Sequence, residues 1–136
     1  MTELSPRAVI DTNVVSFLFK KDDTRAYLYK QDLLGKQLII SFMTVAELKL
    51  WALSRNWGAA RITKMEEHLR QFIVYPVDVR LIDLWAQVVS QGRKTGHAID
   101  SQDAWIAATA LSEGIPLITH NRKDFEWLPK YRNLFC

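Results

Sequence analysis

Four short apolar runs, each stopped by polar residues, are the clearest pattern along the chain. They span residues 7–10, 37–41, 72–75 and 116–119. Within each run the apolar residues are consecutive rather than alternating, and branched aliphatic side chains dominate, which is typical of strands buried on both faces. Pro116 is compatible with the first position of a strand. The pattern therefore predicts four buried β-strands.

The segments between these strands have the spacing and punctuation of helices. We predict helices over residues 13–19, 25–34, 44–54, 57–70, 79–93 and 101–113. Asn56 and Asp78 are placed to cap the fourth and fifth of them, and Gly35 and Gly114 to end the second and the last. Strands that alternate with helices in this way favour an α/β fold, a three-layer sandwich with a mainly parallel central sheet.

Two further features complete this prediction. The fifth helix carries apolar residues at helical spacing, namely Val79, Ile82, Ala86 and Val89. The tail beyond Phe125 is of mixed character, and a short edge strand is predicted near residues 132–135. No linker or repeat divides the chain, so residues 1–136 are expected to form a single domain.

Composition and charge narrow the class of protein. Of the 136 residues, 49% are hydrophobic and 24% are charged, as in an ordinary globular chain. Cys136 is the single cysteine, which excludes an internal disulfide and a cysteine-rich metal site. The N-terminus lacks the layout of a signal peptide, and no apolar run approaches the roughly 18 residues of a membrane span. We therefore expect a soluble, cytoplasmic protein with no membrane partner.

The net charge of +3 comes from 18 basic and 15 acidic residues, which are spread evenly along the chain. Because there is no basic tail or block, the sequence does not indicate a purely electrostatic nucleic-acid binder.

Several of the acidic residues follow the predicted strands. In open parallel sheets, ligands bind beyond the carboxyl ends of the strands. Asp11 follows the first strand, Glu47 the second and Asp124 the fourth, while Asp103 opens the helix that leads into the fourth strand. Polar residues that could support these four acids occur nearby: Asn13, Thr44, Asp100, Thr119 and Asn121.

Carboxylates gathered in this way repel one another unless they are protonated or bridged by cations. Oxygen ligands suit a hard cation, Mg²⁺ or Mn²⁺ as its substitute, and the isolated His68, His97 and His120 do not indicate zinc. Such ions suit phosphodiester hydrolysis, because they lower the pKa of bound water and offset charge on the phosphate. No G-x-S-x-G elbow is present, which argues against acyl transfer.

Each of these signals also has a purely structural interpretation. Asp11 could simply cap the next helix. Thr44 and Glu47 fit a capping box, in which Glu47 reaches back to the backbone of Thr44. Asp100 and Asp103 could merely complement a helix dipole. The convergence of the four acids on one edge of the sheet is what favours a metal site.

Four short motifs occur along the chain, and together they identify a protein family more specifically than any one of them alone. They read VIDTN at residues 9–13, SFMTVAEL at 41–48, DAWIAATA at 103–110 and LITHNRKDF at 117–125. In order and spacing, these segments resemble the PIN-domain nucleases, and within them the VapC-type toxins of type II toxin–antitoxin systems. The resemblance runs over nearly the whole chain.

This resemblance implies a Mg²⁺- or Mn²⁺-dependent endoribonuclease that cuts structured RNA such as tRNA or rRNA. The family's metal-binding and catalytic acids match Asp11, Glu47, Asp103 and, at a more variable position, Asp124. Asn13, Thr119 and Asn121 match polar positions that orient the carboxylates. Asp100 has no fixed counterpart. Trp51 stands where many relatives have glycine, and its bulky ring could reshape the groove, so the resemblance does not settle the substrate preference.

The resemblance also implies a homodimer and a cognate antitoxin whose C-terminal segment occupies the groove of the site. Basic residues near the proposed site are candidates for contacts with RNA phosphates: Arg93, Lys94, Arg122 and Lys123. The alternative on the same fold is a non-catalytic module that binds RNA or protein. An aspartate-based phosphatase is less favoured, because Asn13 stands where such an enzyme needs a second aspartate.

Overall fold

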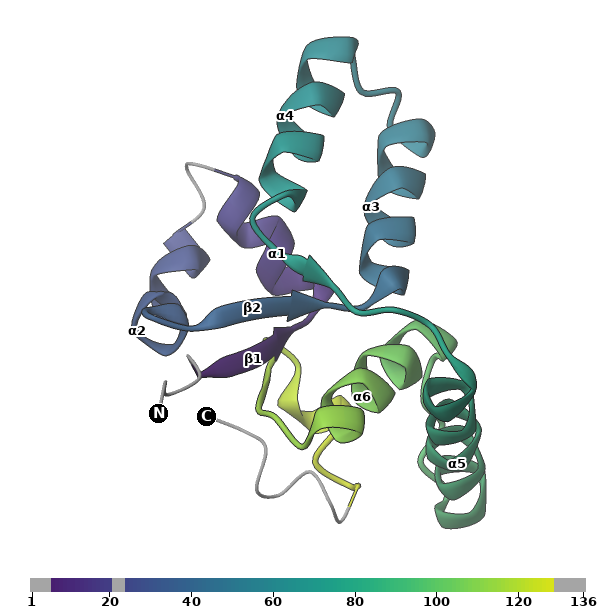
Figure 1. The fold of residues 1–136 in the computed structure, drawn as a ribbon. Helices are drawn as coiled ribbons and strands as arrows, with labels where there is room; N and C mark the ends of the chain where they lie inside the picture. The colour runs from purple at the N-terminus through teal and green to yellow at the C-terminus, as the bar shows by residue number, and fades with distance from the viewer. Residues whose placement is uncertain (1–5, 21–23, 129–136) are drawn as a thin grey trace.

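A parallel sheet lies at the centre of the protein (Figure 1). The computed structural model describes residues 6–20 and 24–128, and within them the sheet has four strands in the order β3-β2-β1-β4. The strands are β1 (Arg7–Ile10), β2 (Gln37–Ile40), β3 (Ile73–Val74) and β4 (Leu117–Ile118). All neighbouring pairs run parallel. The structure confirms the predicted sheet type and places the four strands predicted between residues 7 and 119 to within one residue at each end. The prediction that all four are buried is wrong for β3, because Ile73 and Val74 are exposed at the edge of the sheet.

The register brings the carboxyl ends of the central strands to one edge of the sheet. Val9 pairs with Leu117 and Ile10 with Ile118 across β1 and β4. The backbone N–H of Asp11 then donates to the carbonyl oxygen of Ile118 at 3.1 Å. The polar residues that follow β1 and β4 are therefore neighbours in space, although they lie more than a hundred residues apart along the chain.

Helices cover both faces of this sheet. They are α1 (Thr12–Phe19), α2 (Lys30–Leu33), α3 (Phe42–Ser54), α4 (Ala59–Leu69), α5 (Val79–Thr95) and α6 (Ser101–Glu113), with short 3₁₀ helices η1 (Thr24–Leu28) and η2 (Arg122–Asp124). In Figure 1, α3 and α4 extend away from the sheet as a pair, whereas α5 and α6 lie together on the other side.

The side chains on the two faces of β1 pack into two separate hydrophobic clusters. Ala8 and Ile10 pack with residues of α1, α3 and α4, while Val9 packs with residues of α5 and α6. All three side chains are fully buried. Consecutive apolar residues on a strand are thus explained by helices on both faces, and the predicted three-layer α/β sandwich is confirmed.

Helix α3 begins two residues earlier than predicted. Ser41 is its N-cap, and the Ser41 hydroxyl accepts from the backbone N–H of Met43 at 3.1 Å. Thr44 is therefore inside the first turn, and Glu47 lies in the second turn rather than the first. The capping box suggested for Thr44 and Glu47 is wrong, because Thr44 is not the cap and the Glu47 carboxylate accepts from Thr12 instead.

The start of α4 was also misplaced. Asn56 is not its cap; Gly58 is. Asn56 has a φ of 52°, and its N–H donates to Leu53 while that of Trp57 donates to Ala52. This is the hydrogen-bond pattern of a Schellman motif, which closes a helix with a left-handed residue. Asn56 therefore ends α3 rather than beginning α4.

Two other helices differ in detail from the prediction. The segment expected as one helix over residues 25–34 divides into η1 and α2, and Gly35 follows it with a φ of 73°. In α5, Asp78 is the N-cap as predicted. The core side of α5 is formed by Leu81, Val88 and Gly92. The apolar stripe that begins at Val79 is largely exposed instead.

The strand predicted near residues 132–135 lies outside the described residues. Within the described part of the chain, none of the helices combines the length and the apolar character needed to cross a membrane.

Candidate active site

The four acids singled out in the sequence line one small pocket at the carboxyl edge of the sheet. The pocket has a volume of about 50 Å³. Its walls are formed by Asp11, Thr12, Asn13, Glu47, Asp103, Ile106, Asn121, Asp124 and Phe125. They come from the start of α1, from α3, from α6 and from the segment around η2. Residues far apart in sequence thus meet around one hollow.

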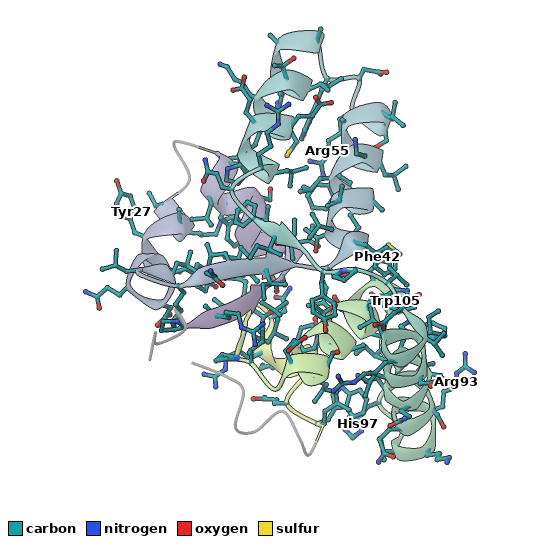
Figure 2. All side chains as sticks on the ribbon, in the orientation of Figure 1. Tyr27, Phe42, Arg55, Arg93, His97 and Trp105 are labelled. Carbon is teal, nitrogen blue, oxygen red and sulfur yellow. The ribbon has the colours of Figure 1, made fainter. Side chains whose placement is uncertain are left out.

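Packing between α3 and α6 accounts for part of this convergence. Phe42, at the first turn of α3, meets the ring of Trp105 on α6 edge-on at a centroid distance of 5.0 Å (Figure 2). Glu47 and Asp103 project from these same two helices into the pocket. The turn of η2, in which the N–H of Asp124 donates to the carbonyl of Asn121 at 3.0 Å, places those two residues on a third wall.

Asp11 has a structural role and also lines the pocket. Its Oδ1 accepts from the backbone N–H of Val14 at 3.0 Å, so it caps α1 as the structural interpretation proposed. Its Oδ2 accepts from the hydroxyl of Thr119. Asp11 is only 4% exposed, and hydrogen bonds to both carboxylate oxygens fix the orientation of its side chain.

Glu47 is oriented by a short chain of hydroxyl groups. The Thr12 hydroxyl donates to Glu47 Oε1 at 2.9 Å and lies 3.0 Å from the Thr44 hydroxyl. A threonine hydroxyl has one proton, so Thr44 must be the donor to Thr12. Thr44 is completely buried and stands behind the pocket rather than in its wall. Sequence reasoning placed Thr44 near the site but missed the role of Thr12, which joins it to the glutamate.

Thr119 links the first acid to the opposite wall. Its hydroxyl donates to Asp11 and accepts from the backbone N–H of Asn121 at 3.0 Å. Like Thr44, Thr119 is buried and supports the pocket without lining it. Asn13 and Asn121 do line the pocket, as expected.

The electrostatic state of the pocket reflects burial and mutual repulsion. Burial raises the pKa of Asp11 and of Glu47 above their usual values, against the effect of their hydroxyl donors. Asp103 is shifted furthest: burial, followed by repulsion from Asp124, Asp100, Asp11 and Glu47, raises its pKa to about 7. Asp100 contributes this repulsion from outside the pocket. It is an exposed residue at the start of α6, and its side chain makes no capping hydrogen bond there.

The donor set of this pocket fits a hard divalent cation. Its polar lining consists of carboxylates, side-chain amides and one hydroxyl, which are ligands for Mg²⁺ or Mn²⁺ rather than zinc. Across residues 6–20 and 24–128, none of these carboxylates has a lysine or arginine within ion-pair distance. A cation bound in the pocket would therefore lower the raised pKa values of these carboxylates.

The carboxylates are not already gathered closely around a single point. In the described ranges, no three acidic, histidine or cysteine side chains are arranged to hold one ion by themselves. A cation in this pocket would have to be held by fewer protein carboxylates, and its other coordination positions would be left to water and substrate. That is the usual pattern for Mg²⁺ in nucleotide-processing sites.

The basic residues proposed for RNA contact divide into two places. Arg122 and Lys123 belong to η2 and immediately precede Asp124, so they lie beside the pocket. Arg93 and Lys94 are in the last turn of α5 and line a different hollow. Figure 2 shows Arg93 pointing outward from α5. The structure therefore brings one basic pair to the site and not the other.

The apolar part of the lining was not anticipated from the sequence. Ile106 lies one helical turn after Asp103 on α6, and Phe125 directly follows Asp124. Both side chains are almost completely buried. The helical spacing of three residues between Asp103 and Ile106 was the available signal, because residues at that spacing share a face.

Comparison with known proteins places the chain in a family. A model of the PIN domain matches residues 8–130. Ribonuclease VapC1 of Haemophilus influenzae strain R2866 is 33% identical over 124 residues, covering 87% of this chain and 89% of that protein. VapC ribonuclease Y4jK of Sinorhizobium fredii is 31% identical over 125 residues, with the same coverage of each chain.

Solved structures show the same likeness. VapBC-1 from nontypeable Haemophilus influenzae matches with a TM-score of 0.78 and 27% identity, covering 92% of this chain and 94% of that one. VapBC2 from Rickettsia felis, bound to a DNA fragment from its promoter, has a TM-score of 0.78 at 19% identity, covering 92% and 95%, and shows likeness of fold. The resemblance in the four sequence motifs is thus confirmed, and the chain belongs to the PIN domain family, with VapC ribonucleases among its relatives.

Proposed function

We propose that this protein is a metal-dependent endoribonuclease, the toxin of a toxin–antitoxin pair, which hydrolyses phosphodiester bonds in structured RNA such as tRNA or rRNA. The observation that carries the proposal is the single pocket lined by Asp11, Glu47, Asp103 and Asp124. It is supported by relatives that are named as VapC ribonucleases. Residues 1–136 would act as one nuclease domain.

Some residues of the site would bind the cation, and others orient the residues that bind it. Thr119 and Thr12 fix the carboxylates of Asp11 and Glu47, so these two acids would be the best-ordered ligands for Mg²⁺ or Mn²⁺. A bound divalent ion would supply a Lewis acid that offsets charge on the phosphodiester and lowers the pKa of water. Without a cation, burial and the neighbouring acids raise the pKa of Asp103 to about 7, so its carboxyl group is partly protonated at neutral pH. Proton release from Asp103 is therefore linked to cation binding.

The partners of the protein follow from the same proposal. The solved relatives include VapBC-1 from nontypeable Haemophilus influenzae and a toxin–antitoxin complex from Klebsiella pneumoniae. By analogy, we expect a cognate antitoxin to bind this chain, and a second copy of the chain to form a homodimer. Since its substrate would be cellular RNA, we expect it to act in the cytoplasm.

RNA cleavage by the purified protein tests this proposal. Cleavage is expected with Mg²⁺ or Mn²⁺, and it should be lost with chelator and in Asp11→Ala and Asp103→Ala. Asp83→Ala is a matched control, because Asp83 is an exposed acid on α5 that makes no contact with the pocket. Activity that survives chelation and both pocket substitutions would show that the mechanism is wrong. RNA binding without cleavage by the wild-type protein would favour the non-catalytic module.

A further inference from the structure

A second hollow lies directly behind the wall of the acidic pocket. Its volume is about 210 Å³. It is lined by Tyr29 and Asp32 from the segment around α2, by residues 117–120 of β4 and the turn after it, and by Arg122. This is smaller than the ~300–1,000 Å³ of pockets for drug-sized ligands. Its size therefore suits one small planar group rather than a large cofactor.

The two hollows share one stretch of chain as a partition. Thr119 lines the second hollow, while its hydroxyl donates to Asp11 in the first. Asn121 lines the acidic pocket, whereas His120 and Arg122 line the second hollow. A ligand in the second hollow would thus lie one residue's width from the acids. Residues 119–122 fix the relative position of the two spaces.

An aromatic pair forms one side of the second hollow. A hydrogen bond of 2.5 Å joins Tyr29 Oη and His120 Nδ1, and their rings lie 6.0 Å apart at 69°. The ring of Phe17 meets His120 edge-on at 5.0 Å, and the Arg25 guanidinium lies 4.0 Å above Phe17. The position of His120 is therefore fixed from two sides. Such fixed rings are the surfaces on which proteins stack unpaired RNA bases.

The polar groups of the hollow carry both signs of charge. Asp32 provides a carboxylate, which accepts hydrogen bonds, and Arg122 provides a guanidinium, which donates them. A carboxylate in the lining disfavours a free phosphate, because two anions would repel each other there. It suits a nucleobase with an exocyclic amino group, since carboxylates accept from such groups in base recognition. Arg122, at the rim beside the acids, suits the adjoining backbone phosphate.

We propose that this second hollow, lined by Tyr29, Asp32, His120 and Arg122, binds the nucleotide next to the scissile phosphodiester of the RNA. The base packs against Tyr29 and His120, and Asp32 selects adenine, cytosine or guanine over uracil. The inference rests on the proposed nuclease function, because the acidic pocket defines where the scissile phosphate lies. The inference assigns part of the RNA sequence preference to residues other than the four acids.

Base preference in cleavage tests this assignment. The substrate is a pool of short single-stranded RNA, and the sites cut with Mn²⁺ are read by sequencing. Wild-type protein should cut least where uridine occupies the flanking position. In Asp32→Ala that bias should fall by about fivefold or more, the discrimination expected of one good base contact. Tyr29→Phe removes the hydrogen bond to His120 and should raise KM for RNA more than it changes kcat.

Two control variants match these changes. Asp83→Ala removes an exposed acid on α5. Tyr27→Phe removes a hydroxyl from an exposed tyrosine only two residues before Tyr29, and Figure 2 shows Tyr27 pointing away from the body of the protein. Both controls should cut with the wild-type base bias. An Asp32→Ala protein that keeps the wild-type bias would overturn the assignment while leaving the nuclease proposal intact.

A binding measurement separates this inference from the proposed activity. With Ca²⁺ in place of Mn²⁺, fluorescence anisotropy should show that wild type binds oligocytidine more tightly than oligouridine, and that Asp32→Ala binds the two equally. If no RNA is ever cut but this difference appears, the proposed activity fails and the base-binding hollow stands. If wild type shows no difference between the two oligonucleotides, the hollow does not read bases in this way.

Discussion

The hydroxyl of Thr119 donates to Oδ2 of Asp11, joining two residues that are 108 positions apart in the chain. The same hydroxyl accepts from the backbone N–H of Asn121. One buried group therefore orients an acid of the candidate active site and also orders the turn that carries the opposite wall. The Thr119 hydroxyl donates its single proton to the carboxylate, which fixes the side chain of Asp11 in an orientation that could bind a cation.

Replacing Thr119 by valine, which has nearly the same shape, removes this link. The Asp11 carboxylate loses a donor, so its pKa rises further, and the N–H of Asn121 loses its acceptor. We expect the free energy of unfolding to fall by about 1–3 kcal/mol, together with a loss of nuclease activity. Urea denaturation and RNA cleavage measure the two effects. Thr63→Val, an exposed position on α4, should change neither; a Thr119→Val protein as stable as wild type would contradict the role assigned to the hydroxyl.

The stability of the metal-free protein should depend on pH through Asp103. Its pKa is about 7 in the folded protein, against a usual value of 3.8. Between these values the folded state binds more protons than the unfolded state, so the free energy of unfolding falls as pH rises. Asp11 and Glu47 shift in the same direction. After allowance for solvent screening of a partly exposed group, the share of Asp103 is about 1–2 kcal/mol.

Urea denaturation in chelator at a series of pH values from 5 to 8 checks this. The decline should be weaker in Asp103→Asn, which has no charge to gain, and unchanged in Asp83→Asn. A wild-type protein that becomes more stable over this interval than the Asp103→Asn variant would contradict the assigned repulsion.

Adding a divalent cation should reverse the same repulsion. At about 100 times its dissociation constant, Mg²⁺ or Mn²⁺ should raise the free energy of unfolding by about 2.7 kcal/mol. At one fixed ion concentration the effect should be larger at pH 8 than at pH 6, because protons compete with the cation for Asp103 and raise its dissociation constant. Thermal melts with and without the ion measure it. Melts that do not respond to either ion would count against a shared cation site.

Gly92 should be intolerant of a side chain although its helix is regular. A Cβ at this position would lie 2.5 Å from the carbonyl oxygen of His97 and 3.2 Å from the ring of Trp127. We expect Gly92→Ala to lower the free energy of unfolding by about 1–3 kcal/mol, the usual range for overpacking. Because the displaced segment leads into α6, RNA cleavage should fall as well.

Calorimetry and cleavage assays of Gly92→Ala measure these two effects. Gly58→Ala provides the comparison, since no atom lies within 4 Å of a Cβ there; it should lose only the N-cap preference for glycine over alanine and no packing. Equal stability of the two variants would show that the loop after α5 moves aside without cost.

The strands β1 and β4 could be predicted from the sequence because burial on both faces leaves consecutive apolar residues. The edge strand β3 has the same apolar pattern, yet its two residues are exposed, so the pattern locates a strand without fixing its burial. Helix boundaries were harder where two residues offered similar caps. Ser41 and Thr44 both have a suitable hydroxyl; the Ser41 hydroxyl caps α3, whereas the Thr44 hydroxyl bonds that of Thr12. Asn56 and Gly58 pose the same problem, which the left-handed conformation of Asn56 decides.

The candidate site was predictable in part, for a topological reason. Strand ends in a parallel sheet share one edge, so the acids after β1 and β2 and around β4 could be expected to meet. The hydroxyl groups that orient them could not be deduced. Thr12 and Glu47 are 35 residues apart, and Thr119 is 108 from Asp11. Only the packing of α1 against α3, and of β4 against β1, brings these pairs within hydrogen-bonding distance.

The segment 119–122 contributes residues both to the acidic pocket and to the second hollow, which affects how the specificity of such a protein can change in evolution. His120 and Arg122 line the second hollow, whereas Asn121 lines the acidic pocket and the Thr119 hydroxyl donates to Asp11. An exchange at position 122 therefore alters the second hollow and keeps Thr119 and Asn121, whereas an exchange at position 120 also removes the electrostatic effect of His120 on the pKa of Asp11. Descendants of one ancestral gene could acquire new RNA targets through changes in this short segment of the chain while the four acids of the pocket are inherited unchanged.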